Sequence, residues 1–135
     1  MSRMNTDSYC LIDGKLLEQE LTEKIISCCF DVANTLGSGF LENVYQKSLV
    51  IALDQKGLSC QSQEPINVVF RGINVGCFYA DIVVEKRVIL EIKAVKALQT
   101  EFEAQLINYL KATSIRVGLL VNFGRQRLEW KRFVF

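Results

Sequence analysis

The sequence predicts an α/β domain in which helices pack against one central mixed β-sheet. Two stretches with helical spacing of apolar residues come first, several segments rich in β-branched residues follow, and a third helical stretch interrupts those segments. A helix between strands is typical of a crossover connection, which favours a mixed sheet. A chain of 135 residues that is 50% hydrophobic also suits a single globular domain.

Two helices are expected in the N-terminal half of the chain. Residues 1–16 have weak apolar periodicity, so we expect a loosely ordered lead-in there. The first helix is expected over residues 21–36 and the second over residues 40–56, because apolar residues share one face in each and a glycine follows each directly. We therefore assign residues 17–135 to one domain.

Strands are expected in the rest of the chain, interrupted by one helix. Four segments with strand composition lie at residues 58–62, 66–71, 77–84 and 88–95. Pro65 is expected to precede the second of these, since proline suits the start of a strand. A third helix is expected over residues 99–113, and two closing strands over residues 115–123 and 127–135. The expected order is ααββββαββ.

Histidine is absent from the chain, which excludes several classes of active site. Ser–His–Asp and Cys–His catalysis, HEXXH zinc sites and histidine-dependent phosphodiesterase sites all need an imidazole. The five cysteines are odd in number and form no C-x-x-C pair, so we interpret most as small core residues. A thiol nucleophile is the alternative, although no imidazole is present to activate it. Carboxylates, lysine and a hard metal ion remain as means of catalysis.

Charge and hydropathy say little about partners. The formal net charge is +1, which is no signature of nucleic-acid binding. No apolar run approaches a membrane span and the N-terminal residues lack the core of a signal peptide, so a soluble cytoplasmic protein without a membrane partner is expected. The stretch GRQRLEWKRF is locally basic, which on its own favours a solvated strand face.

Three charged residues stand where the strand pattern predicts an interior. The stretch YADIVVEKRVILEIKAV carries Asp81, Glu91 and Lys93 among valine, isoleucine and leucine. If Val84 pairs with Val88 across a three-residue connection, the antiparallel register sets Asp81 opposite Glu91. Alternation places Lys93 on the same face as Glu91. A two-residue connection would send Asp81 to the other face, so the hypothesis depends on this register.

Such charges are solvated at an edge, paired with one another, or gathered around an ion. Lys93 alone would make a surface ion pair of little energetic value, which is the simplest interpretation of the triplet. The expected helices favour the interpretation as a metal-ion site. Glu42 begins the apolar stripe of the second helix, and Gln105 and Tyr109 lie at the edge of the apolar stripe of the third helix. Glu42 as a solvated acid near a helix start and Gln105 as a boundary residue are the alternatives.

The stretch GFLENVY places Gly39, Glu42 and Tyr45 in a G-x-x-E-x-x-Y spacing and resembles the GxxExxY protein family. Members of that family are similar to small stand-alone relatives of the RecB-like branch of the PD-(D/E)XK nuclease superfamily. The resemblance runs from about Leu21 to Phe133 and includes YADIVVEKRVILEIKAV, AQLINYLKAT and GLLVNFG in the expected order. It implies a restriction-endonuclease-like core.

The resemblance also implies a Mg²⁺ or Mn²⁺ site. It makes Asp81 the strand aspartate, Glu91 and Lys93 the E-x-K pair, and Glu42 the helical acid. Gln105 and Tyr109 match a Q-h-x-x-Y motif. The implied metal ligands are Asp81, Glu91, the carbonyl of Ile92 and Glu42, and the implied catalytic residues are Lys93, Gln105, Glu42 and Tyr109. Lys93 would orient or deprotonate the attacking water, or stabilise the developing negative charge.

The implied function is a metal-dependent phosphodiesterase acting on DNA, with RNA as the second choice. Candidate phosphate contacts are Lys96, Arg116, Arg125, Arg127 and Lys131. The chain departs from the family pattern at Ala80, which replaces the proline of the PD motif, and at Ala33 and Phe102, where relatives often carry histidine. The alternative function is a catalytically silent nuclease-fold module that binds a partner or forms a homodimer.

Overall fold

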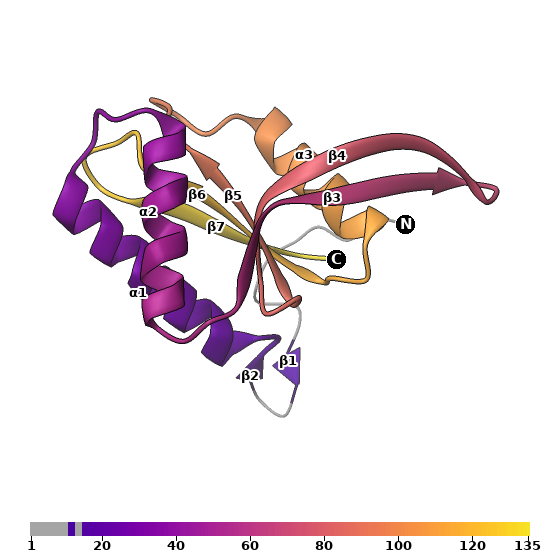
Figure 1. Ribbon diagram of the computed structural model, residues 1–135, viewed down its shortest axis with the longest axis horizontal. Coiled ribbons are helices and arrows are strands. Elements are labelled where there is room, and N and C mark those ends of the chain that lie inside the picture. The colour runs from indigo at the N-terminus through magenta and orange to yellow at the C-terminus, as the bar shows by residue number, and fades with distance from the viewer. Residues whose placement is uncertain (1–10, 13–14) are drawn as a thin grey trace.

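The computed structural model describes residues 11–12 and 15–135. It contains a five-stranded sheet and three helices, so the predicted α/β class is confirmed (Figure 1). The helices are α1 (Gln19–Leu36), α2 (Glu42–Gln55) and α3 (Thr100–Ala112). The sheet strands are β3 (Cys60–Phe70), β4 (Ile73–Val84), β5 (Val88–Lys93), β6 (Val117–Asn122) and β7 (Glu129–Val134).

The sheet is mixed, as predicted. Its spatial order is β3-β4-β5-β6-β7, and β5 and β6 are parallel while every other neighbouring pair is antiparallel. Helix α3 is the crossover between the two parallel strands. Because β5 and β6 run the same way, both end at one edge of the sheet, where Lys93 lies beside Asn122.

The expected order ααββββαββ has one strand too many. The segments predicted at residues 58–62 and 66–71 form a single strand, β3, with Pro65 inside it and opposite Tyr79. Proline is tolerated there because β3 is an edge strand, whose outer backbone groups have no neighbour to pair with. A tight turn with positive φ at Arg71 and Gly72 then leads into β4.

The predicted lead-in lies largely outside the described residues, which omit 1–10 and 13–14. Within it, β1 (Leu11–Ile12) pairs antiparallel with β2 (Lys15–Leu16), so part of the segment expected to be loose is paired.

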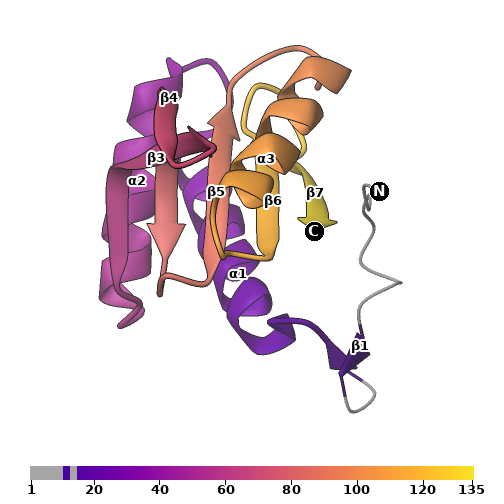
Figure 2. The same ribbon diagram turned by 90° about the vertical axis from the view of Figure 1, so that its right-hand side faces the viewer.

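The sheet separates two hydrophobic clusters. Helices α1 and α2 cover one face and α3 covers the other (Figure 2). Successive strand residues alternate between them, so Leu90 packs with α1 and α2 whereas Ile89 packs with α3. Cys28 and Cys29 are buried, as expected of core residues, whereas Cys77 is exposed.

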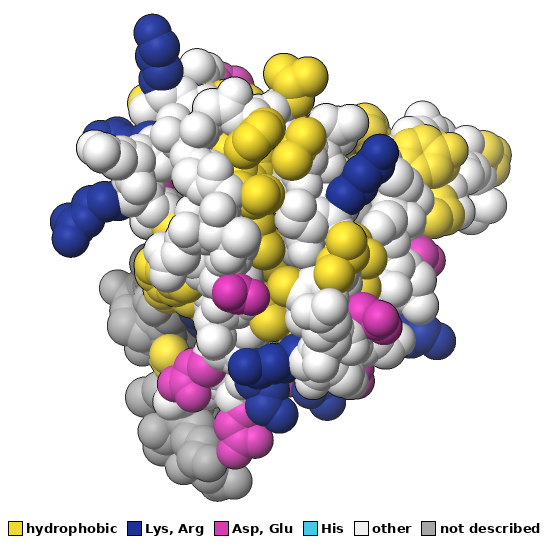
Figure 3. Space-filling model, turned by 60° about the vertical axis from the view of Figure 1, so that its left-hand side comes forward, with side chains coloured by type: hydrophobic (Ala, Val, Ile, Leu, Met, Phe, Trp, Pro, Cys, Tyr) yellow, Lys and Arg dark blue, Asp and Glu magenta, His cyan; other side chains and the backbone are white. Residues whose placement is uncertain are grey.

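Strands β3 and β4 continue beyond the sheet as a two-stranded arm, which we define as residues 65–80 (Figure 1). The arm exposes large apolar side chains, as Figure 3 shows at its end. Val69, Phe70, Ile73 and Val75 are each 59–66% exposed. An isolated ribbon of two strands has little stability of its own, so the arm depends on its packing against α3.

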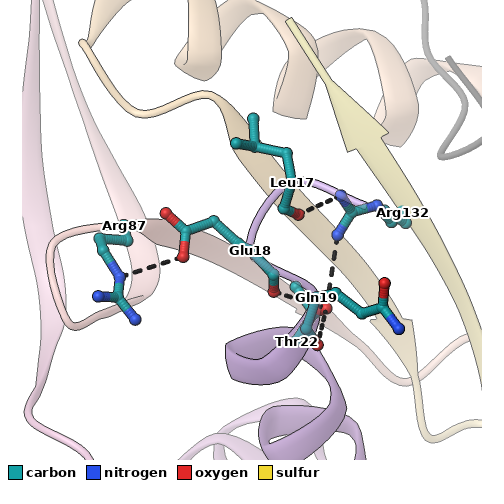
Figure 4. Close-up of polar contacts among 6 residues, drawn as sticks. All are labelled: Leu17, Glu18, Gln19, Thr22, Arg87 and Arg132. Carbon is teal, nitrogen blue, oxygen red and sulfur yellow. Dashed lines mark hydrogen bonds and ion pairs between the residues drawn. The ribbon is translucent and has the colours of Figure 1, made fainter. Parts of the chain in front are cut away.

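Polar contacts fasten the start of α1 to the sheet (Figure 4). The Arg132 guanidinium, on β7, donates to the Leu17 carbonyl and, at 3.4 Å, to the Thr22 hydroxyl. The same hydroxyl lies 3.0 Å from the Glu18 carbonyl. Glu18 also forms a 3.2 Å ion pair with Arg87. Arg132 is 7% exposed, so its guanidinium relies on hydrogen bonds inside the protein more than on solvent.

Replacing Arg132 with methionine is expected to lower the free energy of unfolding by about 1–3 kcal/mol, because buried acceptors lose their donor. Arg87→Met removes a charge from the half-exposed pair with Glu18, so its expected cost is only about 0–1 kcal/mol. Urea denaturation of both variants measures the difference. Equal losses in the free energy of unfolding would show that the greater burial of Arg132 does not increase its contribution to stability.

Candidate metal centre

The G-x-x-E-x-x-Y stretch places Glu42 at the start of α2. Gly39 has a φ of +116°, a conformation that favours glycine, and lets the chain turn between α1 and α2. The Tyr45 hydroxyl donates to the Gly37 carbonyl at 2.6 Å and accepts from the Phe40 N–H at 3.2 Å. These bonds fix the loop, so Glu42 enters the first turn of the helix in a defined position.

Tyr45 also links this loop to the strand that carries the E-x-K pair. Its ring is fully buried and stacks on Phe123 with ring centroids 4.8 Å apart. The Phe123 N–H in turn donates to the Lys93 carbonyl at 2.8 Å. Tyr45 is therefore a positioning residue that holds the start of α2 against the end of β5.

The structure confirms the register on which the carboxylate pair depends. Val84 pairs with Val88, and the ladder between β4 and β5 ends at Ile82 and Leu90. Beyond Ile82 and Leu90, the carboxylates of Asp81 and Glu91 accept the hydrogen bonds that join the two strands. The Asp81 N–H donates to Glu91 Oε2 at 2.9 Å, and the Ile92 N–H donates to Asp81 Oδ2 at 2.8 Å.

This arrangement also orients the carbonyl of Ile92. In a strand, the N–H and C=O of one residue point to the same side. The Ile92 N–H points toward β4, where Asp81 accepts it, so its carbonyl faces the same gap. The position suits the implied role of Ile92 as an oxygen ligand.

A local kink in β3 lies directly behind Asp81. Gln63 has a φ of +52°, which residues other than glycine rarely adopt, and its side chain hydrogen-bonds the Asp81 carboxylate. Ile82 packs with α1 and α2, whereas Ala80, two residues earlier, packs with α3. The face of β4 therefore reverses at Asp81, and this reversal turns the arm toward α3.

The acids repel one another in a largely buried setting. Burial, with the nearby charges of Asp81 and Glu42, raises the pKa of Glu91 to about 8. Burial also raises the pKa of Asp81, although the Ile92 N–H, Lys93 and Gln63 act in the opposite direction. Glu91 is only 4% exposed, so near neutral pH the pair holds a proton that a cation would displace.

Glu42 and Lys93 complete the polar cluster. Partial burial raises the pKa of Glu42, with Lys93 opposing and Asp81 reinforcing the shift. The Lys93 ammonium lies 4.5 Å from the centroid of the Phe102 ring, a cation–π contact. Phe102 thus occupies the position where relatives were expected to carry histidine, and it supports the lysine. The structure brings Glu42, Asp81, Glu91 and Lys93 together.

Helix α3 contributes Tyr109 and Gln105, but in different settings. Tyr109 is 6% exposed, and its pKa is raised by burial and by the charges of Glu91 and Asp81. Gln105 is exposed, which agrees with the alternative interpretation of this residue as a boundary residue of α3. The two residues that follow it, Leu106 and Ile107, are buried instead.

The candidate phosphate contacts do not form one patch. Lys96 follows β5, and Arg125 and Arg127 lie between β6 and β7, so these three share the edge where β5 ends. Arg116 precedes β6 at the opposite end of the parallel pair, since Val117 lies beside Val88. Lys131 is paired with Glu103 at 2.6 Å. On the face in Figure 3, basic side chains are dispersed.

Three polar residues near the site were not predicted from the sequence: Gln46, Gln63 and Asn122. The Gln46 amide donates to the Asp81 carbonyl at 3.1 Å. Asn122 is fully buried and bonds to both the N–H and the C=O of Val95, which fixes the chain after β5. An asparagine inside the apolar run VGLLVNF was a usable signal, because a buried amide needs partners. Nothing in the sequence marks Gln46 or Gln63.

The donor set fits Mg²⁺ or Mn²⁺ better than a metal that needs a closed cage. Within residues 11–12 and 15–135, no three Asp, Glu, Cys or His side chains are grouped so as to hold a metal. Mg²⁺, however, keeps several waters and needs only one or two carboxylates. Asp81 and Glu91 supply these, and the Ile92 carbonyl faces the same gap.

A family model described as "PD-(D/E)XK nuclease superfamily" matches residues 19–133. The chain belongs to the PD-(D/E)XK nuclease superfamily. The match spans all three helices and the five-stranded sheet. Metal-dependent nuclease chemistry is the activity associated with this superfamily, and its members generally use divalent metals.

A solved structure titled "Crystal structure of SSO0001" is similar to this superfamily member, with a TM-score of 0.49 and 17% sequence identity. The similarity covers 87% of this chain and 58% of that chain, so this chain spans less than two thirds of it. A search of curated proteins finds no match. Among the described residues, no helix is both long and apolar enough to cross a membrane.

Proposed function

We propose that this protein is a Mg²⁺- or Mn²⁺-dependent phosphodiesterase that cleaves nucleic acid, with DNA as the preferred substrate over RNA. The observation that carries the proposal is the pairing of Asp81 and Glu91, whose carboxylates lie together at the point where β4 and β5 separate. A buried and a half-buried acid in mutual repulsion are costly without a cation, so their juxtaposition supports a binding role.

Asp81, Glu91 and the carbonyl of Ile92 would hold the ion directly, and Glu42 would act through a bound water. The ion would lower the pKa of a coordinated water and offset charge on the phosphate. Lys93 would orient or deprotonate the attacking water, or stabilise the developing negative charge. Its contact with Phe102 keeps the ammonium near the acids.

The residues around this centre would position the substrate. Tyr109 and Gln105 would hydrogen-bond the water or the scissile strand. Lys96, Arg125 and Arg127 would contact phosphates near the site, whereas Arg116 and Lys131 would serve only a long substrate. Because so few basic side chains lie near the site, the affinity for nucleic acid is expected to be modest and strongly salt-dependent.

The GxxExxY family is the branch to which we assign the chain, because the loop from Gly37 to Tyr45 has a defined role here. We further propose that residues 17–135 act as one domain in the cytoplasm. The second candidate function is a silent binding module, possible as a homodimer, which the exposed apolar arm favours.

The metal site is tested by replacing Asp81 with asparagine. The amide keeps an oxygen for the Ile92 N–H but loses the charge, so the affinity for Mn²⁺ is expected to fall at least about 10-fold. Isothermal titration at constant pH measures this change. Incubation of both proteins with single-stranded, duplex and branched DNA then measures cleavage.

The matched control is Asp54→Asn, which removes the same charge from an exposed position at the end of α2. Equal Mn²⁺ affinity in wild type and Asp81→Asn would contradict the proposed site. Metal binding by the wild type without cleavage of any of the three DNA forms would support the silent module instead.

A further inference from the structure

A groove lies between α3 and the arm, next to the acids. Its volume is about 820 Å³, and its lining includes Asn67 and Phe78 from the arm and Gln105, Asn108, Tyr109 and Lys111 from α3. A space of this size accepts a ligand of several hundred daltons rather than a few waters.

The groove adjoins the candidate metal centre through Tyr109. Gln105 and Tyr109 line it, and Tyr109 is close enough to Glu91 and Asp81 for their charges to act on its hydroxyl. The kink at Gln63 turns the arm toward α3 and so forms the opposite wall. A chain lying in the groove would therefore reach the acids at one end.

The lining suits bases rather than phosphates. Phe78 is 46% exposed, and its ring centroid lies 6.0 Å from that of Tyr109, which leaves ring surface available for stacking. The amides of Asn67, Asn108 and Gln105 can both donate and accept hydrogen bonds. Charge is sparse, since the only charged lining residues are Glu101 and Lys111, which are opposite in sign. The groove therefore offers little to a phosphate backbone, which is held by Lys and Arg.

We propose that this groove binds an unpaired nucleic-acid strand, with bases stacked on Phe78, and leads that strand to the metal centre. The proposal rests on the proposed function and specifies its substrate class. A duplex keeps its bases stacked inside and presents phosphates, so it cannot use an aromatic platform. An unpaired strand can turn its bases toward the groove while its backbone stays in solvent.

The test is binding of a fluorescein-labelled oligo(dT), followed by anisotropy in EDTA at low salt, where no metal-dependent cleavage occurs. Stacking of one base is worth enough that Phe78→Ala is expected to weaken binding about 5- to 150-fold. Phe70→Ala is the matched control, because Phe70 is a 59% exposed aromatic residue of the same arm that does not line the groove. It is expected to leave the affinity unchanged.

A second variant guards against a folding defect. Asn108→Ala changes an exposed groove residue on α3 and is expected to weaken binding several-fold while the thermal melt stays unchanged. The labelled duplex oligo(dT)·oligo(dA) is expected to bind more weakly than oligo(dT) alone. Equal loss in Phe78→Ala and Phe70→Ala, equal or tighter duplex binding, or no binding of oligo(dT) would each overturn the proposal.

These outcomes are separate from those of the metal-site test. The anisotropy experiment contains no metal, and the acids repel the probe equally in all variants, so their effect cancels in the comparison. A silent module with this groove would still bind oligo(dT) through Phe78. A nuclease that grips only duplex would bind Mn²⁺ through Asp81 but show no effect of Phe78→Ala.

Discussion

Replacing Glu91 with glutamine is expected to make the metal-free protein more stable at pH 8 while abolishing metal-dependent cleavage. Glu91 is 4% exposed and has a raised pKa of about 8, so its ionisation in the folded protein is costly. Glutamine resembles the protonated acid and keeps an oxygen to accept the Asp81 N–H. The substitution therefore removes the free-energy cost of ionising residue 91 and also the negative charge that would bind the metal ion.

The sign of the pH dependence follows from proton binding. Between about pH 4.5 and 8, the folded wild type holds a proton on Glu91 that the unfolded chain has released. Its stability is therefore fully present below that range and declines as the pH rises through it. The full decline is worth about 5 kcal/mol, taking about 1.4 kcal/mol for each pKa unit over the shift from 4.5 to about 8. In Glu91→Gln this part of the slope is expected to be missing.

Urea unfolding in EDTA at several pH values between 5 and 9 measures both slopes. Addition of Mn²⁺ at pH 8 is then expected to stabilise the wild type by mass action and to leave Glu91→Gln nearly unchanged. Glu101→Gln, which removes a charge from an exposed position on α3, serves as the control. Identical pH slopes in wild type and Glu91→Gln would show that Glu91 ionises without cost. Equal stabilisation of the two proteins by Mn²⁺ would show that Glu91 holds no ion.

The acid pair was predictable from the sequence because strand registers are discrete. With Val84 and Val88 paired across a three-residue connection, Asp81 must lie opposite Glu91. The mixed sheet was predictable for a similar reason, since a helix between two buried strands leaves few topologies. Both predictions rest on local pattern and chain connectivity.

The features that the sequence did not reveal depend on tertiary context. Pro65 looked like a strand boundary because proline breaks a ladder, yet an edge strand has no ladder on its outer side. The kink at Gln63 has no compositional signal, because glutamine rarely adopts a positive φ. Without that kink, neither the arm's approach to α3 nor the groove can be anticipated from the residue pattern.

Replacing Lys93 with methionine is expected to lower the rate of cleavage about 10²- to 10⁴-fold while metal binding persists. Methionine keeps a flexible apolar chain that can lie against the Phe102 ring, as the lysine does now, so the packing is retained. What is lost is the ammonium that is proposed to act on the attacking water. Lys24→Met, at an exposed position on α1, is the matched control and is expected to cleave normally.

The lysine also lowers the pKa of each of the three acids, so its removal should raise the pH at which Mn²⁺ binds half-maximally. Titration calorimetry at several pH values measures that shift, and single-turnover cleavage measures the rate. The two readouts separate the candidate functions, because a silent module would show the shift in metal binding without any cleavage to lose. A variant that cleaves at the wild-type rate would remove Lys93 from the chemistry and leave the acids to act alone.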